Sequence, residues 1–441
     1  MEMSILIVAL ILFGFIFFFL GTGLWIAVAL GVVGFIGLTV FLEGMDVIIA
    51  AATFNVLCSY PMAAMPLFIF MGEIIYQSGL NKKLYRGASK WVGVLPGSLL
   101  HANIVSCAIF AACSGSSMAT AATMGSVAYP EQKERGYDNR MVLGSLAGGG
   151  TLGILIPPSI TMIIYGAFVG ESVGRLFMGG VVPGFATALM FMVYIGVRSV
   201  ANPGLVPERR QRVTLRYFPD AVIALKDVWP ALVLIFFIMG SIYGGLATPT
   251  EAGAVAALIA LVLAALFKSL NFGVLKRAAL ETISLNAMIA FILLGASILG
   301  YAFSLLKIPF MLAGAVAAAG LSPLTVWLLA LLLYLFLGCF IPGLAVMILT
   351  LPVIYPLLTG LGFDGVWLGV MLVMTVECAM LTPPVGTILF VLQGVAKEKD
   401  ITNVALGSLP FFGVLVVSVA IWTFFPQLVL FLPNMMFAPQ W

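Results

Sequence analysis
Two pairs of adjacent prolines stand inside long apolar runs of the sequence, Pro157-Pro158 and Pro383-Pro384. A proline within a helix removes one hydrogen bond and collides with the preceding turn, which costs about 3 kcal/mol or more. A helix broken there exposes carbonyl oxygens, which suit a small cation, and a new helix N-terminus, which attracts anions. The two pairs therefore predict two places where unwound backbone binds ions.

A run of small residues, Ser114, Gly115, Ser116 and Ser117, is the second candidate for ion chemistry. Serine hydroxyls add oxygen ligands, and glycine lets a ligand approach the backbone closely. A tight contact between two membrane helices is the alternative role for such residues. We expect a cation site here. A related site is expected at GCFIPG, where carbonyl groups replace the hydroxyls of the first segment: Gly338, Cys339, Pro342 and Gly343.

Small and hydroxyl-bearing residues also flank the proline pairs. If the two breaks meet the two small-residue segments, two cation sites result, and an anionic substrate would lie between them. The carbonyl and hydroxyl groups expected to line this central cavity belong to Gly153, Ser159, Thr161, Thr382, Gly386 and Thr387.

Three carboxylates lie within apolar segments or at the edge of one, where acidic residues are functional candidates. Glu251 follows Thr248 and Thr250 at the start of an apolar run, so we expect it to stabilise a helix N-terminus. Glu377 comes one or two turns before the second proline pair, and both a structural and a coupling role stay open. Glu73 would pair with a neighbouring helix or a second subunit.

The elements that carry these residues are membrane helices. The chain is 63% hydrophobic and 8% charged, whereas soluble domains average roughly 25% charged residues. The first apolar run lacks a basic start and a clear cleavage site, so we expect a retained helix and not a secretory signal. Near-continuous runs of spanning length occupy 4–20, 24–42, 176–197, 228–247, 252–267 and 405–432.

The sequence contains an internal repeat with a register of 226 positions. This offset relates the two proline pairs, Tyr129-Pro130 to Tyr355-Pro356, and Cys113 to Cys339. It also relates Gly136 and Asp138 to Gly362 and Asp364. The chain therefore consists of two homologous halves joined by a basic linker.

Basic residues predict the orientation, because short cytoplasmic loops accumulate Lys and Arg. If the clusters at 82–90, 133–140, 198–226, 268–277 and 397–399 face the cytoplasm, only Arg175 and Lys307 of the 20 basic residues face outward. The apolar segment 91–130 then has basic clusters on both sides, so it must enter and return as a re-entrant hairpin. The corresponding segment of the second half, 309–356, would enter the membrane from the outside. Because each half crosses the membrane an odd number of times, the second half would be inverted relative to the first.

The predicted fold is an all-α polytopic membrane protein built of two inverted structural repeats, each with about five crossings. The first repeat covers 1–200, with a hairpin at 91–130 and a broken helix at 141–169. A cytoplasmic linker at 201–227 leads to the second repeat at 228–441, with a hairpin at 309–356 and a broken helix at 366–395. Both termini would be periplasmic. Inverted repeats with broken helices are typical of secondary transporters.

Several motifs together resemble the large membrane subunit of tripartite ATP-independent periplasmic (TRAP) transporters, of the ion-transporter superfamily. They are MPLFIFMGEI at 65–74, the hairpin and IPPS at 113–159, ATPTEAGAVA at 247–256 and LTPPVG at 381–386. The resemblance implies sodium-coupled uptake of an organic anion, usually a carboxylate or sialic acid, across the bacterial inner membrane. It also implies an elevator mechanism, a periplasmic substrate-binding protein and a separate small four-helix membrane subunit.

The resemblance further implies which residues bind each ion. One sodium site would combine the 114–117 tip with the break that contains Gly153 and Pro157. The other would combine the 338–343 tip with Thr382 and Pro383, and Pro158 and Pro384 would join the substrate contacts. The hairpins and broken helices would move, while the amphipathic segments near 44–59 and 268–282 would belong to the static scaffold.

Three other functions compete with this interpretation. A stand-alone sodium–carboxylate symporter of the same superfamily would share the hairpins and breaks. An intramembrane serine protease is disfavoured, because SGSS lacks a G-x-S-x-G turn and His101 lies about 13 residues before the tip. A channel is the third alternative, but a pore would not need two broken helices, each with its own hairpin.

The lone histidine excludes a multi-histidine metal centre, and the five cysteines are expected to be reduced and buried.

Overall fold

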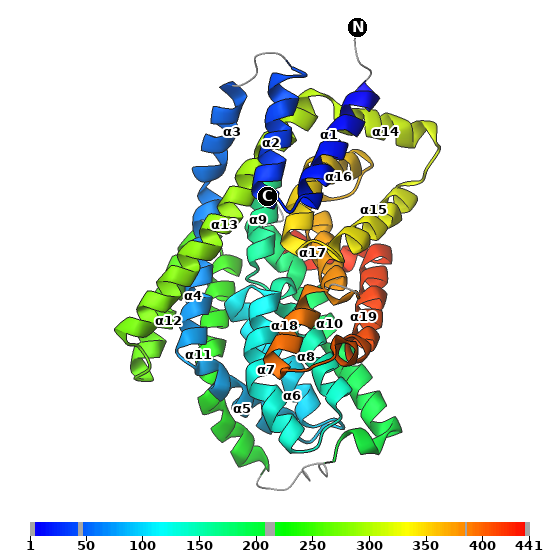
Figure 1. Cartoon of the computed structure of the whole chain (residues 1–441). Coiled ribbons are helices and arrows are strands. Elements are labelled where there is room, and N and C mark those ends of the chain that lie inside the picture. Colours follow the sequence, from blue (N-terminus) through cyan, green and yellow to red (C-terminus); the bar gives the residue numbers. More distant parts are fainter. Residues whose placement is uncertain (1–4, 43–46, 208–216, 384–385, 437–441) are drawn as a thin grey trace.

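The computed structural model (Figure 1) describes residues 5–42, 47–207, 217–383 and 386–436. Within these ranges every regular element is a helix. The first half contains α1 (Ile5–Gly21), α2 (Ile26–Thr39), α3 (Val47–Leu57), η1 (Tyr60–Ala63), α4 (Ala64–Gln77), α5 (Leu80–Val92), α6 (Leu99–Ser114), α7 (Ser117–Glu134), α8 (Asn139–Leu155), α9 (Ile160–Val169), α10 (Val173–Ala201) and η2 (Pro203–Leu205). The second half contains α11 (Tyr217–Tyr243), α12 (Pro249–Leu266), α13 (Phe272–Leu305), α14 (Ile308–Ala318), α15 (Pro323–Gly338), α16 (Gly343–Gly360), α17 (Gly365–Leu381), α18 (Thr387–Ala396), α19 (Ile401–Phe424) and α20 (Pro426–Met436).

Many of these helices have the length and apolar character of membrane spans. Among the described residues, seven helical segments qualify, or eight if α3 and the bent continuation through α4 count as one span. The two parts of that pair meet at 48°. The chain is therefore a multi-pass membrane protein. The expectation of about five crossings in each half stays a prediction, since α1, α2, α15 and α17 are shorter than 18 residues.

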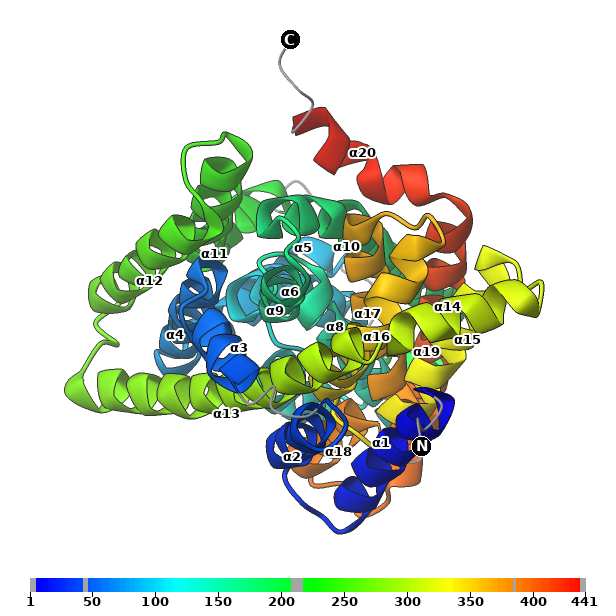
Figure 2. The ribbon, with the colours of Figure 1, turned by 90° about the horizontal axis from the view of Figure 1, so that it is seen from above.

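The proline-broken helices form the core of the molecule. Helix α8 is buried from Met141 to Leu155, and α17 is buried from Val366 to Leu381. Helix α8 packs against α6, α7, α17 and α19. Figure 2 shows α8, α9 and α17 near the middle, with α11, α12 and α13 along one side of the molecule. Uniformly apolar helices are expected in such positions, because no face of them meets water.

Single prolines leave these helices continuous, whereas the paired prolines interrupt them. Helix α7 continues through Pro130, and α10 continues through Pro183. At the first pair, α8 ends at Leu155 and α9 begins only at Ile160. At the second pair, α17 ends at Leu381 and α18 begins at Thr387, while Pro384 lies outside the described residues. Both interruptions predicted from the sequence are present.

The repeat register of 226 recurs in the local backbone structure. Gly136 and Gly362 both have positive φ, at 79° and 94°. Two residues later, Asp138 accepts the backbone N–H of Met141 and caps α8, and Asp364 caps α17 in the same way. The two halves therefore begin their broken helices with the same turn and the same cap.

Three predicted segments have different boundaries in the structure. The amphipathic segment predicted near 268–282 continues into the longer helix α13, because no glycine or proline occurs between Val274 and Leu294. The run 405–432 is divided into α19 and α20, since a residue before proline disfavours helical geometry and Pro426 follows Phe425. The segment 309–356 contains α14 as well as the hairpin helices α15 and α16, because α14 ends before Gly320, whose φ is positive.

Candidate functional site
The first small-residue tip lies against the first proline break. Helices α6 and α7 meet at Gly115 and Ser116, as the sequence predicts. A Cβ atom on Gly115 would lie 3.1 Å from the carbonyl oxygen of Pro158. A Cβ atom on Gly153 would lie 2.6 Å from the carbonyl oxygen of Ser116, so α8 and the tip touch through backbone. This contact agrees with the pairing of tip and break that the family resemblance implies.

The hydroxyl groups of this first tip are close to one another; Ser114 and Thr120 are buried, and Ser116 is half-buried. Ser114 Oγ lies 2.9 Å from Thr120 Oγ1, and Thr120 Oγ1 donates a hydrogen bond of 2.8 Å to the carbonyl of Ser116. Ser116 caps α7 by accepting the backbone N–H of Ala119. Each hydroxyl oxygen keeps lone pairs that a cation could use.

Glu377 completes the first site from the other half of the chain. Ser117 Oγ donates a hydrogen bond of 2.5 Å to Glu377 Oε1. Glu377 is fully buried, and its Oε2 has no hydrogen-bond partner among the described residues. An ionised carboxylate at this depth needs a cation beside it. The sequence assigned Glu377 to the neighbourhood of the second break, whereas the structure joins it to the first tip.

Glu73 borders the same tip from another side. It lines a cavity of about 150 Å³ together with Ser114, Ser116 and Thr123. Gln77 Nε2 donates a hydrogen bond of 3.4 Å to Glu73, and Arg277 on α13 donates one of 3.1 Å to Gln77. Among the described residues, the Glu73 carboxylate is therefore hydrogen-bonded within its own helix, and Gln77 links it to Arg277 of the neighbouring helix α13.

The second tip lies against α17 and the second break through close contacts of its glycines and of the Cys339 sulfur. A Cβ atom on Gly338 would lie 2.3 Å from the Cβ of Ala379 on α17. Cys339 Sγ lies 3.9 Å from the carbonyl oxygen of Pro383. Cys339 and Thr382 are half-buried, and Pro342 and Pro383 are exposed, while Gly343 is buried. The predicted pairing of tip and break holds here too, in a more open setting.

The residues predicted to contact substrate lie at the two breaks and at the start of the helices that follow them. Ser159 is buried and caps α9 by accepting the N–H of Met162. Thr161 is also buried, and Gly386 forms a tight turn with Thr382. Thr387 Oγ1 is buried without a hydrogen-bond partner in the described structure. Pro157 and Pro158 are buried in the first break, and Pro384 falls outside the described residues.

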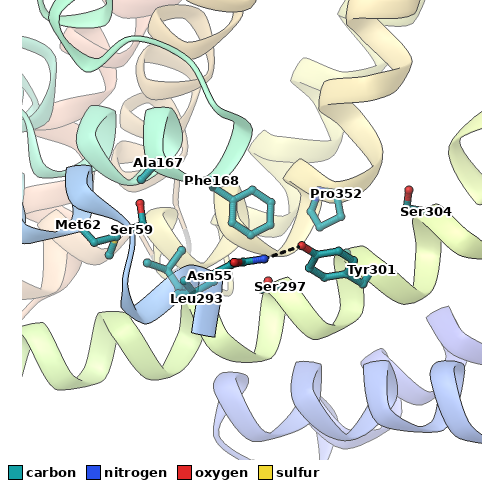
Figure 3. Close-up of a pocket in the computed structure, with 12 residues that line it drawn as sticks. Asn55, Ser59, Met62, Ala167, Phe168, Leu293, Ser297, Tyr301, Ser304 and Pro352 are labelled. Atoms are coloured by element: carbon teal, nitrogen blue, oxygen red, sulfur yellow. Dashed lines mark hydrogen bonds between the residues drawn. The ribbon is translucent and has the colours of Figure 1, made fainter. Parts of the chain in front are cut away.

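A cavity of about 330 Å³ lies elsewhere, between α3, α9, α13 and α16 (Figure 3). Its polar groups are uncharged, and Asn55 Nδ2 donates a hydrogen bond of 3.4 Å to Tyr301. Phe168 and Pro352 form the opposite wall. The sequence gave no signal for this cavity, because its residues come from four separate helices and none belongs to a motif.

Three other residues have structural roles. Thr248 and Glu251 form a capping box at the start of α12, as their spacing predicts. His101 Nε2 lies 2.7 Å from the carbonyl of Pro96, and His101 is buried in α6. The histidine is therefore engaged with a turn of its own chain and not with the serines of the tip.

Two tyrosine–glutamate contacts join the halves, and the sequence did not reveal their partners. Tyr129 on α7 donates a hydrogen bond of 2.5 Å to Glu398, after α18. Tyr355 on α16 donates one of 3.1 Å to Glu171, after α9. The hydrogen bond from Tyr129 holds the pKa of Glu398 below its ordinary value. The two tyrosines are related by the repeat register, so each hairpin is tied to the broken helix of the other half.

Comparison with known proteins identifies the family. A family model described as "Tripartite ATP-independent periplasmic transporter, DctM component" matches residues 13–428. The chain belongs to this family. It is 34% identical over 440 residues to the C4-dicarboxylate TRAP transporter large permease protein DctM of Vibrio cholerae, covering 95% of this chain and 96% of that protein.

A second relative of this TRAP permease has a different named solute. The sialic acid TRAP transporter large permease protein SiaM of Vibrio cholerae is 31% identical over 380 residues, covering 86% of this chain and 87% of the relative. In fold, the chain is similar to the YdaH transporter of Alcanivorax borkumensis, with a TM-score of 0.64 and 16% identity over 88% of this chain and 90% of that one. The chain is thus a TRAP large permease and a multi-pass protein of the inner membrane.

Proposed function
We propose that this permease carries out sodium-coupled uptake of an organic anion, a carboxylate or a sialic-acid-like acid. The observation that carries the proposal is the first site, where a helix tip, a broken helix and Glu377 meet in the buried core. A cation bound there would neutralise the carboxylate and hold the two halves together.

The donor atoms of this site suit sodium. The described part of the chain contains no group of three or more His, Cys, Asp or Glu placed to hold a metal ion. A cation would therefore be held mainly by carbonyl and hydroxyl oxygens, which are the ligands that hard monovalent and alkaline-earth ions prefer. Ser114, Ser117 and Glu377 would hold one sodium ion, and carbonyls near Cys339 and Thr382 would hold another.

For transport we propose a movement of the corresponding elements of both predicted repeats. The hairpins α6–α7 and α15–α16 and the broken helices α8–α9 and α17–α18 would move together as an elevator. Helices α11 to α13 would stay fixed. The cavity of Figure 3 lies between α3 and α13 on one side and α9 and α16 on the other, so it would change during such a movement.

The solute and the partners are proposed from the family. The two relatives are similarly distant from this chain, yet one is named for C4-dicarboxylates and the other for sialic acid. Overall similarity therefore does not select between these anions. We propose that a periplasmic binding protein delivers the solute and that a separate small four-helix subunit completes the membrane complex.

Reconstitution tests this function directly. The chain and its small subunit are placed in vesicles, a sodium gradient is imposed, and uptake from a loaded binding protein is followed. Uptake should require sodium and the binding protein, and a matched potassium gradient should not replace sodium. Uptake at the same rate with and without the sodium gradient would contradict the proposal. Uptake of a free carboxylate by the chain alone would instead identify a stand-alone symporter.

A further inference from the structure
A basic pocket lies far from the ion sites, between α5 and α7. It has a volume of about 520 Å³. Its lining includes the four basic residues Lys82, Arg86, Lys90 and Arg135 and the single acidic residue Glu131. The pocket therefore carries a net positive charge, although the surrounding molecule is largely apolar.

One wall of the pocket is a row of cations on α5. Lys82, Arg86 and Lys90 are spaced four residues apart, so they lie on the same face of the helix. Lys82 and Arg86 are exposed and Lys90 is half-buried. None of the three forms an ion pair with a carboxylate in the described parts of the chain.

Repulsion between the three cations of α5 destabilises this helix unless an anion lies beside them. Like charges four residues apart destabilise a helix by a few tenths of a kcal/mol per pair. The sequence of α5, LNKKLYRGASKWV, supplies no acidic residue to offset them. On the opposite wall, Glu131 is already engaged, because its Oε1 lies 2.6 Å from Arg135 Nη2.

The rest of the lining combines apolar and hydrogen-bonding groups. Leu99 and Val127 face the pocket, together with Tyr85 and Ser98. Tyr85 accepts a hydrogen bond of 2.8 Å from Gln132 Nε2, which fixes the phenol between α5 and α7. Trp91 follows Lys90 directly, and tryptophan is enriched at the level of lipid headgroups.

We propose that this pocket binds the phosphodiester headgroup of an anionic phospholipid from the cytoplasmic leaflet. Basic pockets between membrane helices on that side attract anionic headgroups. The residues belong to two of the basic clusters that the positive-inside rule assigns to the cytoplasm. A lipid is favoured over free phosphate because the lining also offers apolar contacts for the glycerol and the start of an acyl chain.

Occupation of the pocket would brace the first hairpin. Helix α5 packs against α11 on one side and against α6 and α7 on the other. A headgroup held by Lys82 and Arg86 on α5 and by Arg135 after α7 would therefore link a helix of the scaffold side to the hairpin that carries the first tip.

The test measures lipid binding and does not require transport. The full chain is delipidated in detergent and titrated with dioleoylphosphatidylglycerol, and bound lipid is counted by native mass spectrometry. The triple variant Lys82→Gln, Arg86→Gln, Lys90→Gln removes the row of cations. Lys83→Gln is the matched control, because Lys83 lies on the same helix but its Nζ is 3.9 Å from the ring centre of Phe267, outside the pocket lining.

We expect one saturable phosphatidylglycerol site, weakened about tenfold or more in the triple variant and unchanged in Lys83→Gln. The double variant Lys82→Arg, Lys90→Arg should keep the binding, which separates the loss of charge from a loss of folding. Equal binding by the triple variant and the control would overturn the proposal. Displacement of the lipid by millimolar inorganic phosphate, or equal binding of dioleoylphosphatidylcholine, would also overturn it.

Discussion
The two tips of this permease share a backbone plan but differ in chemistry. The first presents serine hydroxyls to a buried setting and is bordered by Glu73 and Glu377. The second is half-exposed, and its residues lie against apolar side chains of α17 such as Ala379 and Val376 and near the carbonyl of Pro383. The two halves therefore interrupt their helices at equivalent positions, although the atoms available as ligands differ between them.

Because their ligand atoms differ, we expect the two tips to respond differently to mutation. A substitution at the first tip can remove a hydroxyl group or carboxylate that would bind the ion. At the second tip the proposed ligands are backbone carbonyl groups, which remain when a side chain is changed and the backbone keeps its position. We therefore expect substitutions at the first tip to change sodium dependence and substitutions at the second tip to act only when they move the backbone.

The largest effect is expected from Gly153→Ala. The new Cβ would lie 2.6 Å from the backbone of Ser116 and Ser117, which no side chain can relieve. The tip must move away from the break, and sodium-driven uptake in vesicles should fall by more than tenfold. Gly394→Ala is the control, because no atom lies within 4 Å of a Cβ there. Equal uptake by both variants would show that the contact is dispensable.

Ser117→Ala should have the next largest effect. Loss of its hydroxyl leaves Glu377 Oε1 without the hydrogen bond, and an unpaired buried polar group costs about 1–3 kcal/mol. We expect the sodium concentration for half-maximal uptake to rise about fivefold or more, with a smaller rise for Ser114→Ala. An unchanged sodium dependence in both variants would remove these serines from the site.

Cys339→Ala should have little effect. The cysteine is half-buried, and the proposed ligands of the second site are carbonyl oxygens that alanine retains. Sodium dependence of uptake should change by less than about twofold. A shift as large as that of Ser117→Ala would mean that the side chains of both tips contribute equally.

Tyr129→Phe should change the stability of the protein and not its sodium dependence, and the change should depend on pH. The hydrogen bond to Glu398 lowers the pKa of this carboxyl, so its stabilising contribution is present above the ordinary glutamate pKa of about 4.3 and is lost as the pH falls through the lowered pKa. The variant should be less stable by about 1 kcal/mol at pH 7. Thermal unfolding in detergent should show this difference shrinking in acid, and a constant difference would disprove the link.

The residues themselves were sufficient to predict the breaks and the tips, whereas the pairing of each tip with its break came from the family resemblance. Paired prolines, small residues and the repeat register each have a local physical meaning, and the caps by Asp138 and Asp364 follow the same register. The sequence could not predict that Glu377 meets Ser117, because 260 positions separate them and no counterpart exists in the first half. The continuous helix α13 was missed because its basic amphipathic start resembled an independent segment.

Direct sodium binding to Glu377→Gln tests the central proposal of a sodium site at the first tip. Glutamine keeps the size of the side chain and can still bond Ser117, so only the buried charge is removed. Radiolabelled sodium bound to the purified complex is measured by scintillation proximity, beside Cys339→Ala. We predict that Glu377→Gln weakens one sodium site by about tenfold or more, while Cys339→Ala binds sodium as the unaltered chain does. Sodium binding by Glu377→Gln that equals that of the unaltered chain would contradict the assignment.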